Sequence, residues 1–313
     1  MDDLVAGDRS AARSPARLVL GTAQWGMSYG VANRTGPPEV GEVARLLATA
    51  SAAGVRTIDT AHAYGPSEAL IGELARGKDT WRVVTKVTPD AWQEGIGRAT
   101  ALERLDSSLR DSRAALGLDR LDTVLLHRGS HRTALGGALW AELRRRRDAG
   151  EVRRVGVSAV NPDEAFEALA DADVGTIQVA ASLLDRRLER AGFFRDAASA
   201  GREVFVRSVF LQGAAFLDGP ALPLHLRPLV EPLEAIRAWA HGHGCGMVEA
   251  FLWAVRRLPV AGVLIGCETV AQLQQDLDAW TAQGPTGADL EGVAALVDPL
   301  PDEVLDPSRW PHA

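Results

Sequence analysis

The sequence is short of several features, and each shortage excludes a class of protein. Two cysteines among 313 residues, Cys245 and Cys267, provide no framework of disulfide bonds and fit a reducing cytoplasm. No uninterrupted apolar run approaches the roughly 18 residues that a membrane-spanning helix needs. The first residues, MDDLVAGDRSAARSPAR, lack the apolar stretch of a secretory signal. These shortages predict a cytoplasmic protein with no membrane segment.

Basic residues are also in the minority, with 34 Lys and Arg against 41 Asp and Glu and a net charge of −7. This balance argues against nucleic acids and anionic membranes as partners. Hydrophobic residues make up 46% of the chain, which is enough to fill a large core. Residues 1–15 are small, polar and charged, so we expect a disordered arm there, followed by one domain over residues 16–313.

Short apolar runs alternate with helix-like segments along the chain, and no linker interrupts them. The apolar runs have the length and composition of buried strands. We place the eight strands at residues 18–24, 55–59, 81–86, 121–126, 152–158, 176–180, 201–208 and 260–266. Leucines at helical spacing over residues 98–116 illustrate the segments between them. The alternation predicts an α/β protein, a single-domain (β/α)8 TIM barrel with its active site at the C-terminal ends of the strands.

Four side chains that can move or orient a proton stand at neighbouring strand ends. Asp59 ends the second strand, and Tyr64 follows it on a loop. Lys86 ends the third strand, and His127 follows the fourth. Each residue alone fits an architectural role, such as a buried ion pair, a packed turn or a core histidine. In a closed parallel barrel, however, all strand ends meet at one face, so we expect the four to converge.

These residues belong to short motifs that together resemble the aldo-keto reductases. The motifs are DTAHAYG (59–65), the TK of VVTK (85–86), LLH (125–127), GVS (156–158) and RSVFLQG (207–213). Their order and spacing match from about residue 17 to about residue 283. The resemblance implies a (β/α)8 barrel that binds a nicotinamide cofactor and reduces carbonyl groups.

Carbonyl reduction explains why these four residue types occur together. The reaction needs a hydride from the cofactor and a proton for the forming alkoxide, and we assign the proton to Tyr64 as general acid and base. The cation of Lys86 favours the tyrosinate form of a neighbouring phenol. Asp59 pairs with that cation, so that it is not an unmatched buried charge. His127 is assigned to donate to the carbonyl oxygen and orient it. The family's catalytic tetrad implies the same four roles.

The resemblance also implies a cofactor site. Ser158 and Gln178 would hold the nicotinamide amide, because a primary amide needs both a donor and an acceptor. Ala159 stands where the family often has Asn, and Arg207 stands where many members stack an aromatic ring on the nicotinamide. The expected cofactor residues are Gly21, Thr22, Ala23, Asp59, Ser158, Gln178, Arg207, Ser208, Val209, Phe210, Gln212, Gly213, Ile265, Gly266, Gln272, Gln275 and Asp276.

The residues and the resemblance disagree on which nicotinamide cofactor is used. No Lys or Arg occurs from Leu264 to Gln283, where many family members bind the 2′-phosphate of NADP with a basic residue. Glu268, Gln272 and Asp276 stand there instead, which favours NADH. The family resemblance favours NADPH. We expect NADPH, with NADH as the alternative.

Candidate substrate residues lie in the loops that follow the strands. Trp25, Met27 and Tyr29 follow the first strand, Trp92 follows the third and Arg128 follows the fourth. Two alternatives stay open: the first loop could be a hydrophobic plug over the barrel, and Arg128 could form an ordinary salt bridge. A metal site is not predicted, because the HGHGC run at residues 241–245 is typical of a capped turn after a helix.

The expected function is the NAD(P)H-dependent reduction of an aldehyde or ketone to an alcohol. The substrate is expected to be a small carbonyl compound, such as a sugar or a natural-product intermediate, and the protein a monomer or small homo-oligomer. One alternative is an epimerase or dehydratase that acts through a transient ketone without net redox change. Another is a non-catalytic redox-sensing or partner-binding subunit on the same barrel.

Overall fold

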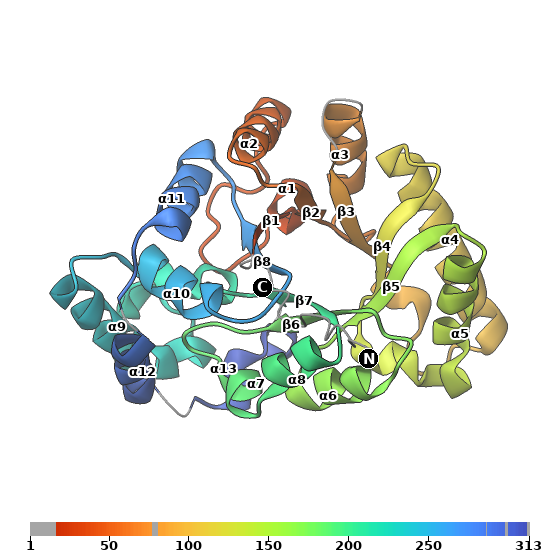
Figure 1. The fold of residues 1–313 in the computed structure, drawn as a ribbon. Helices are drawn as coiled ribbons and strands as arrows, with labels where there is room; N and C mark the ends of the chain where they lie inside the picture. The colour runs from red at the N-terminus through yellow and green to blue at the C-terminus, as the bar shows by residue number, and fades with distance from the viewer. Residues whose placement is uncertain (1–16, 77–80, 286, 298–299, 312–313) are drawn as a thin grey trace, which may run out of the picture.

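The computed structural model describes residues 17–76, 81–285, 287–297 and 300–311. In this part of the chain eight strands form a closed ring, and helices surround it (Figure 1). The (β/α)8 barrel predicted from the sequence is therefore confirmed. The expected disordered arm at residues 1–15 lies outside the described residues.

Every strand of the barrel is parallel to its two neighbours, and β1 pairs with β8 to close the ring. The strands are β1 (Arg17–Gly21), β2 (Thr57–Asp59), β3 (Arg82–Lys86), β4 (Leu121–Leu126), β5 (Val152–Ser158), β6 (Thr176–Ala180), β7 (Glu203–Arg207) and β8 (Gly262–Gly266). Strands β4 to β6 occupy the predicted residues. The first strand ends three residues earlier than expected, because the chain turns at Thr22 into the short helix α1 (Ala23–Gly26).

Helices follow each strand and cover the outside of the ring (Figure 1). The longer ones are α2 (Val40–Ala52), α3 (Ser67–Ala75), α4 (Arg98–Leu116), α5 (Ala134–Asp148), α6 (Pro162–Ala170), α9 (Val230–Gly242), α10 (Met247–Arg256), α11 (Val270–Thr281) and α12 (Gly287–Leu296). The short ones are α7 (Arg187–Arg190), α8 (Phe193–Ser199) and α13 (Asp302–Leu305). Helix α4 matches its predicted bounds and ends at Gly117, whose φ of 64° suits a residue without a Cβ.

Side chains alternate between the inside of the ring and the surrounding helices, as the two-residue period of a strand requires. Val19, Val84, Leu125 and Phe205 form a small apolar cluster of their own, separate from the main core. Their strand neighbours, such as Val83, belong to the large core beneath the helices. The barrel interior is therefore a packed layer, with polar layers at either end of it.

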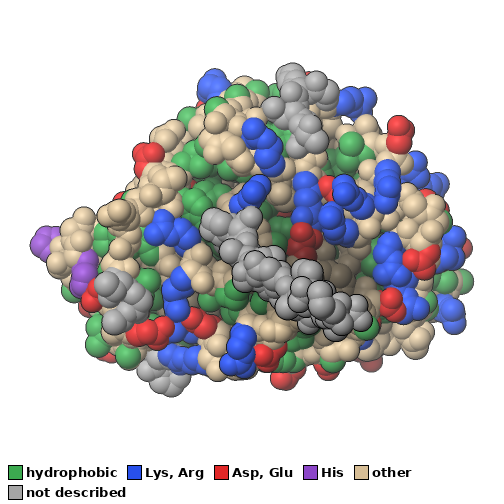
Figure 2. Space-filling view, in the orientation of Figure 1, with side chains coloured by type: hydrophobic (Ala, Val, Ile, Leu, Met, Phe, Trp, Pro, Cys, Tyr) green, Lys and Arg blue, Asp and Glu red, His purple; other side chains and the backbone are tan. Residues whose placement is uncertain are grey.

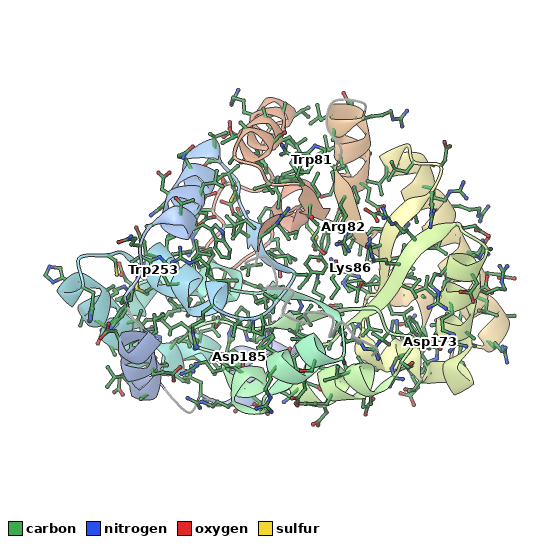
Figure 3. The ribbon with its side chains drawn as sticks, viewed as in Figure 1. Trp81, Arg82, Lys86, Asp173, Asp185 and Trp253 are labelled. Atoms are coloured by element: carbon green, nitrogen blue, oxygen red, sulfur yellow. The ribbon has the colours of Figure 1, made fainter. Side chains whose placement is uncertain are left out.

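One polar layer lies at the N-terminal ends of the strands. Arg82, the first residue of β3, forms an ion pair with Glu203, the first residue of β7. It also donates to Thr123 Oγ1 at 3.0 Å, and Thr176 Oγ1 donates to Glu203 Oε2 at 3.2 Å. Arg82 and Lys86 are the first and last residues of β3. Because side chains alternate along a strand, both point to the inside of the ring (Figure 3). The second polar layer, which contains Lys86, is thus at the opposite end of the strands.

The segment that follows β7 contains short 3-10 helices. These are η3 (Leu211–Phe216), η4 (Gly219–Ala221) and η5 (Leu224–Leu229). Its prolines and glycines interrupt longer helices but permit tight turns. The segment therefore has a defined backbone path, which matters because its first part lies beside the strand ends that carry the candidate site.

The surface in Figure 2 mixes basic and acidic side chains, with basic ones gathered near the centre of the view. Among the described residues, no helix combines the length and the apolar character needed to cross a membrane. Large apolar side chains that are exposed in this part of the chain include Met27, Val40, Phe216, Leu224 and Leu296.

Replacing Phe205 with alanine tests the packed interior of the barrel. Phe205 is 2% exposed and Arg82 lies over its ring, 5.2 Å from the centroid. We expect Phe205→Ala to lower the free energy of unfolding by about 3–5 kcal/mol, because it leaves a cavity between the two polar layers. Urea denaturation followed by circular dichroism measures this. Leu224→Ala is the control: its side chain is 86% exposed, so the change should stay within about 0.5 kcal/mol. A loss below about 1 kcal/mol at Phe205 would contradict a packed interior.

Candidate active site

The candidate site lies at the C-terminal ends of the strands, where each strand presents its last inward-facing side chain. Asp59 and Lys86 are the last residues of β2 and β3, and Ser158 and Arg207 are the last residues of β5 and β7. Gln178 of β6 pairs in register with Ser158. Strand period and parallel register therefore bring residues from distant parts of the chain to one layer.

Lys86 is at the centre of this layer and is 2% exposed. Its ammonium donates to Asp59 Oδ1 at 2.6 Å and to the carbonyl oxygen of Thr60 at 2.8 Å. Burial alone would lower the pKa of Lys86, but the charges of Asp59 and Tyr64 and their hydrogen bonds outweigh it, so the pKa is raised. Asp59 accepts a second hydrogen bond from Gln178 Nε2 at 2.7 Å. These hydrogen bonds hold the Lys86 ammonium in place, and both oxygens of the Asp59 carboxylate accept a hydrogen bond.

Tyr64 reaches this cation from the turn that follows β2. Its ring centroid lies 5.0 Å from Lys86 Nζ, and its ring meets that of His127 edge to face at 6.2 Å. The turn depends on Gly26 of α1, because a Cβ there would lie 1.8 Å from the Tyr64 carbonyl oxygen. The first strand–helix connection thus packs directly against the backbone of Tyr64 and fixes its position.

His127 stands on the other side of the tyrosine as a neutral imidazole. Burial, together with the positive charges of Lys86, Arg207 and Arg128, lowers its pKa to about 3. Its Nδ1 is buried with no hydrogen-bond partner among the described residues. A neutral imidazole keeps one N–H group to donate, so His127 can serve a carbonyl oxygen without carrying a charge.

A cavity of about 470 Å³ opens beside Asp59, Tyr64 and Gln178, which line it, whereas Lys86 and His127 lie behind its wall. Of the seventeen residues expected at the cofactor, all but Ser158 line it. Ser158 is 4% exposed and lies beside Gln178 without reaching the cavity wall. Residues of the wall that the sequence analysis did not assign are Gln24, Gly30, Ala32, Asn33, Phe216, Met247, Val248 and Leu264. Most are small or apolar residues of loops and helix ends, whose sequence carries no binding signal.

Gln178 offers a specific test of whether a nicotinamide fits. Its Nε2 is engaged by Asp59, but its Oε1 is buried without a hydrogen-bond partner among the described residues. A buried acceptor without a partner is costly, and a carboxamide N–H₂ group would satisfy it. The wall of the cavity at Gln178 therefore fits the amide of a nicotinamide cofactor.

The segment after β7 forms one wall of the cavity, and its backbone is strained. Ser208, Leu211 and Gln212 have φ values of 60°, 48° and 53°, a region that non-glycine residues rarely adopt. Val31 donates its N–H to the Gln212 carbonyl oxygen at 3.0 Å, which ties this segment to the loop after α1. Arg207 donates to Ser208 Oγ at 3.2 Å and to the Ala159 carbonyl oxygen at 2.9 Å. Strain held in place by such contacts is typical of a ligand-binding wall.

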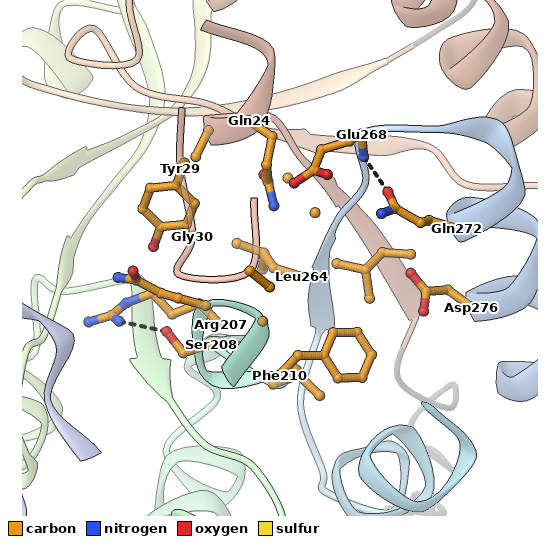
Figure 4. Close-up of a pocket in the computed structure, with 18 of the residues that line it drawn as sticks. Gln24, Tyr29, Gly30, Arg207, Ser208, Phe210, Leu264, Glu268, Gln272 and Asp276 are labelled. Atoms are coloured by element: carbon orange, nitrogen blue, oxygen red, sulfur yellow. Dashed lines mark hydrogen bonds between the residues drawn. The ribbon is translucent and has the colours of Figure 1, made fainter. Parts of the chain in front are cut away.

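The two ends of the cavity differ in charge (Figure 4). Arg207 and Tyr29 lie at one end, near the Lys86 layer. Glu268, just before α11, and Gln272 and Asp276, within the helix, lie at the other. Asp276 is 5% exposed and accepts a hydrogen bond from the Cys267 thiol at 3.3 Å. Burial raises the pKa of Asp276 to about 7 despite that hydrogen bond.

The five residues expected to contact substrate are placed differently from one another. Tyr29 lines the cavity, and burial raises the pKa of its phenol to about 12. Met27 is 38% exposed, and Arg128 is exposed beside His127. Trp92 packs edge to face on His131, 5.9 Å away, outside the cavity wall.

Trp25 does not line the cavity. It is 1% exposed and its indole N–H donates to the Cys267 carbonyl oxygen at 3.3 Å, which joins α1 to the end of β8. Trp25 therefore packs in the core at this end of the barrel.

The HGHGC run at residues 241–245 forms a turn at the end of α9. His243 Nδ1 lies 2.8 Å from the Trp239 carbonyl oxygen, and its ring stacks on the Trp239 ring at 4.4 Å. Within the ranges that the structure describes, no three His, Cys, Asp or Glu side chains are grouped to hold a metal ion.

Comparison with known proteins connects this geometry to one family. Residues 17–286 match the model of the Aldo/keto reductase family. Morphine 6-dehydrogenase of Pseudomonas putida is 32% identical over 133 residues, which are 42% of this chain and only 43% of that protein. D-threo-aldose 1-dehydrogenase of Pseudomonas sp is 27% identical over 334 residues, which cover 92% of this chain and 98% of that protein. The chain thus matches less than half the length of the first relative.

A solved structure extends the likeness to the whole fold. The holo form of aldo-keto reductase AKR11C1 from Bacillus halodurans has a TM-score of 0.72 and 20% sequence identity to this chain. The match covers 95% of this chain and 96% of that one.

The buried carboxyl of Asp276 predicts a pH-dependent stability. Its folded pKa of about 7 lies above the ordinary value of 3.8, so the folded protein holds a proton that the unfolded chain releases. This contribution is fully present below about pH 4 and is lost as the pH rises through 7. Asp276→Asn keeps the neutral form at every pH. We expect its unfolding free energy to exceed that of the wild type at pH 8, by up to about 4 kcal/mol.

Urea denaturation of both proteins at pH 4, 6 and 8 measures this difference. It should grow between pH 4 and 7 and then level off. A difference that is independent of pH would show that Asp276 does not titrate in this way.

Proposed function

Because the chain belongs to the aldo/keto reductase family, we propose that it is an NAD(P)H-dependent oxidoreductase that reduces the carbonyl of an aldehyde or ketone to an alcohol. The observation that carries the proposal is the Lys86 ammonium, which Asp59 and Thr60 hold beside Tyr64 at the wall of the cavity. A binding module would have no need for a buried cation aimed at a phenol.

A bound nicotinamide would supply the hydride, and the chain's own residues supply the proton and the orientation. Gln178 would accept a hydrogen bond from the carboxamide through its free Oε1, and Ser158 lies behind it. The 207–213 segment would border the phosphates with its strained backbone. Gly21 and Gly266 would allow close approach of the ligand at the ends of β1 and β8, where the two residues are register partners.

Tyr64 is the proposed proton donor to the forming alkoxide. Lys86 stabilises the tyrosinate that remains, because its raised pKa keeps it cationic throughout the cycle. Asp59 holds the ammonium in place and is itself held by Gln178, so the acid and the amide site share one hydrogen-bond network.

His127 is proposed to donate a hydrogen bond to the substrate oxygen. Its pKa of about 3 means that it is neutral at physiological pH, so it orients the oxygen without competing with Tyr64 as an acid. Tyr29 is the other tyrosine of the chain, and its pKa of about 12 makes it unsuited to proton transfer. We assign Tyr29 and Met27 to the substrate side of the cavity mouth.

The substrate class is proposed to be a small hydroxy or carbonyl compound. Two relatives are named as dehydrogenases, one of morphine and one of a D-threo-aldose. A sugar or a natural-product intermediate therefore remains the proposed substrate. Arg128, exposed beside His127, would favour an anionic or polyhydroxy compound.

Tyr64→Phe tests the assignment of the proton donor. General acid catalysis typically contributes about 10²–10⁴-fold, so we expect kcat to fall by at least about two decades. Cofactor binding should be nearly unchanged, because the phenol oxygen is not assigned to the cofactor. Steady-state reduction of a generic aldehyde, followed by NAD(P)H absorbance, measures the rate.

Tyr29→Phe is the matched comparison and should change KM much more than kcat. Full activity of Tyr64→Phe would remove Tyr64 as the acid. Stoichiometric consumption of NAD(P)H by the wild type separates the reductase from an epimerase or dehydratase, which would return the cofactor unchanged.

A further inference from the structure

We propose that the cavity selects NADH over NADPH, because the end that would receive the adenosine ribose is already supplied with anions. The inference rests on the proposed function, since it takes a nicotinamide dinucleotide as the ligand. It departs from the expectation of NADPH that the family resemblance implies.

Four backbone N–H groups at the start of α11 already donate hydrogen bonds to side chains. The N–H groups of Glu268 and Thr269 donate to Gln272 Oε1 at 2.7 and 3.1 Å. The Gln272 N–H donates to Thr269 Oγ1 at 3.2 Å, and the Val270 N–H donates to Glu42 Oε1 at 2.7 Å. A helix N-terminus often binds phosphate through such groups, but here they are occupied.

One of these partners is itself an anion from another helix. Glu42 comes from α2, and its hydrogen bonds with Val270 and Arg45 lower its pKa, so it is ionised at neutral pH. A carboxylate at this position already occupies the favourable end of the helix dipole. Glu42 does not line the cavity, but its charge already fills the place at the helix start that a phosphate would otherwise favour.

At this end of the cavity, no Lys or Arg of the described part of the chain lines the wall to compensate for the repulsion of a 2′-phosphate. Arg207 is the only Lys or Arg among the described residues that line the cavity, and it lies at the opposite end (Figure 4). Arg45 lies near α11, but its guanidinium is bound to Glu42, with Nε 3.1 Å from Oε2. The residues that line the cavity at this end include the Glu268 carboxylate and the Asp276 carboxyl, whose pKa of about 7 leaves it partly protonated at neutral pH, so Glu268 is the main source of repulsion.

A ribose hydroxyl suits the same surroundings that a phosphate does not. The 2′-hydroxyl of NADH can donate to a carboxylate such as Glu268, whereas the phosphate of NADPH is an acceptor with about two negative charges. Like charges at close range in a partly desolvated cavity disfavour binding strongly. We therefore expect a preference for NADH of at least tenfold in Kd.

The test is equilibrium binding of the full chain to NADH and to NADPH, followed by the change in cofactor fluorescence at fixed ionic strength. The expected result for the wild type is a Kd for NADH at least tenfold below that for NADPH. Glu268→Arg should reduce this ratio by at least tenfold, mainly by tightening NADPH. Asp278→Arg is the matched control: it makes the same change from a negative to a positive charge on α11, at an exposed residue outside the cavity wall, and should leave the ratio nearly unchanged.

Glu42→Gln is a second variant, which removes the anion at the helix start while keeping an acceptor for Val270. It should also shift the ratio towards NADPH. Equal or tighter binding of NADPH by the wild type overturns the inference, even if carbonyl reduction is observed. A clear preference for NADH without turnover of any aldehyde supports the inference and counts against the proposed reductase. Failure to bind either cofactor overturns both.

Discussion

The site is organised around the buried ammonium of Lys86, which would be unstable in the interior without an ion pair and hydrogen bonds. Lys86 is 2% exposed, and a cation in such a place is tolerated only when it is paired and hydrogen-bonded. Asp59, at the end of β2, and Thr60, which follows it, accept hydrogen bonds from this ammonium. Gln178, on the far side of the barrel, donates to the second oxygen of the Asp59 carboxylate. Tyr64, His127 and the wall of the cavity are arranged around this pair. A rearrangement of any of the three strands would expose or orphan the charge.

Much of this arrangement could be predicted from the sequence, because it depends on the pattern of apolar and polar residues within each short segment. The apolar runs that end at Asp59 and Lys86 indicated strands, and parallel strands in a ring must bring their ends together. Strands β4 to β6 and helix α4 lie where the sequence placed them. The fold class and the family resemblance are confirmed, whereas the roles assigned to single residues stay predictions.

Other features depend on contacts between residues that are far apart in the sequence, and no local pattern reveals them. Glu42 reaches Val270 across 228 positions, and Trp25 reaches Cys267 across 242. The sequence therefore gave no reason to place a glutamate at the start of α11 or to bury Trp25 away from the cavity. The backbone of the 207–213 segment was also unpredictable, because left-handed φ values at Leu211 and Gln212 go against the preferences of those residues.

The burial of Lys86 has a chemical consequence for a member of the aldo/keto reductase family. Free amines condense with aldehydes to imines, and only the unprotonated nitrogen, with its lone pair, can attack. Lys86 is kept protonated and its hydrogens are engaged by oxygen atoms, so its nitrogen is not a nucleophile. The chain has only one other lysine, at position 78, and carries its remaining basic side chains as arginine. Such a composition limits covalent self-modification by a reactive carbonyl compound while preserving the charge on the surface.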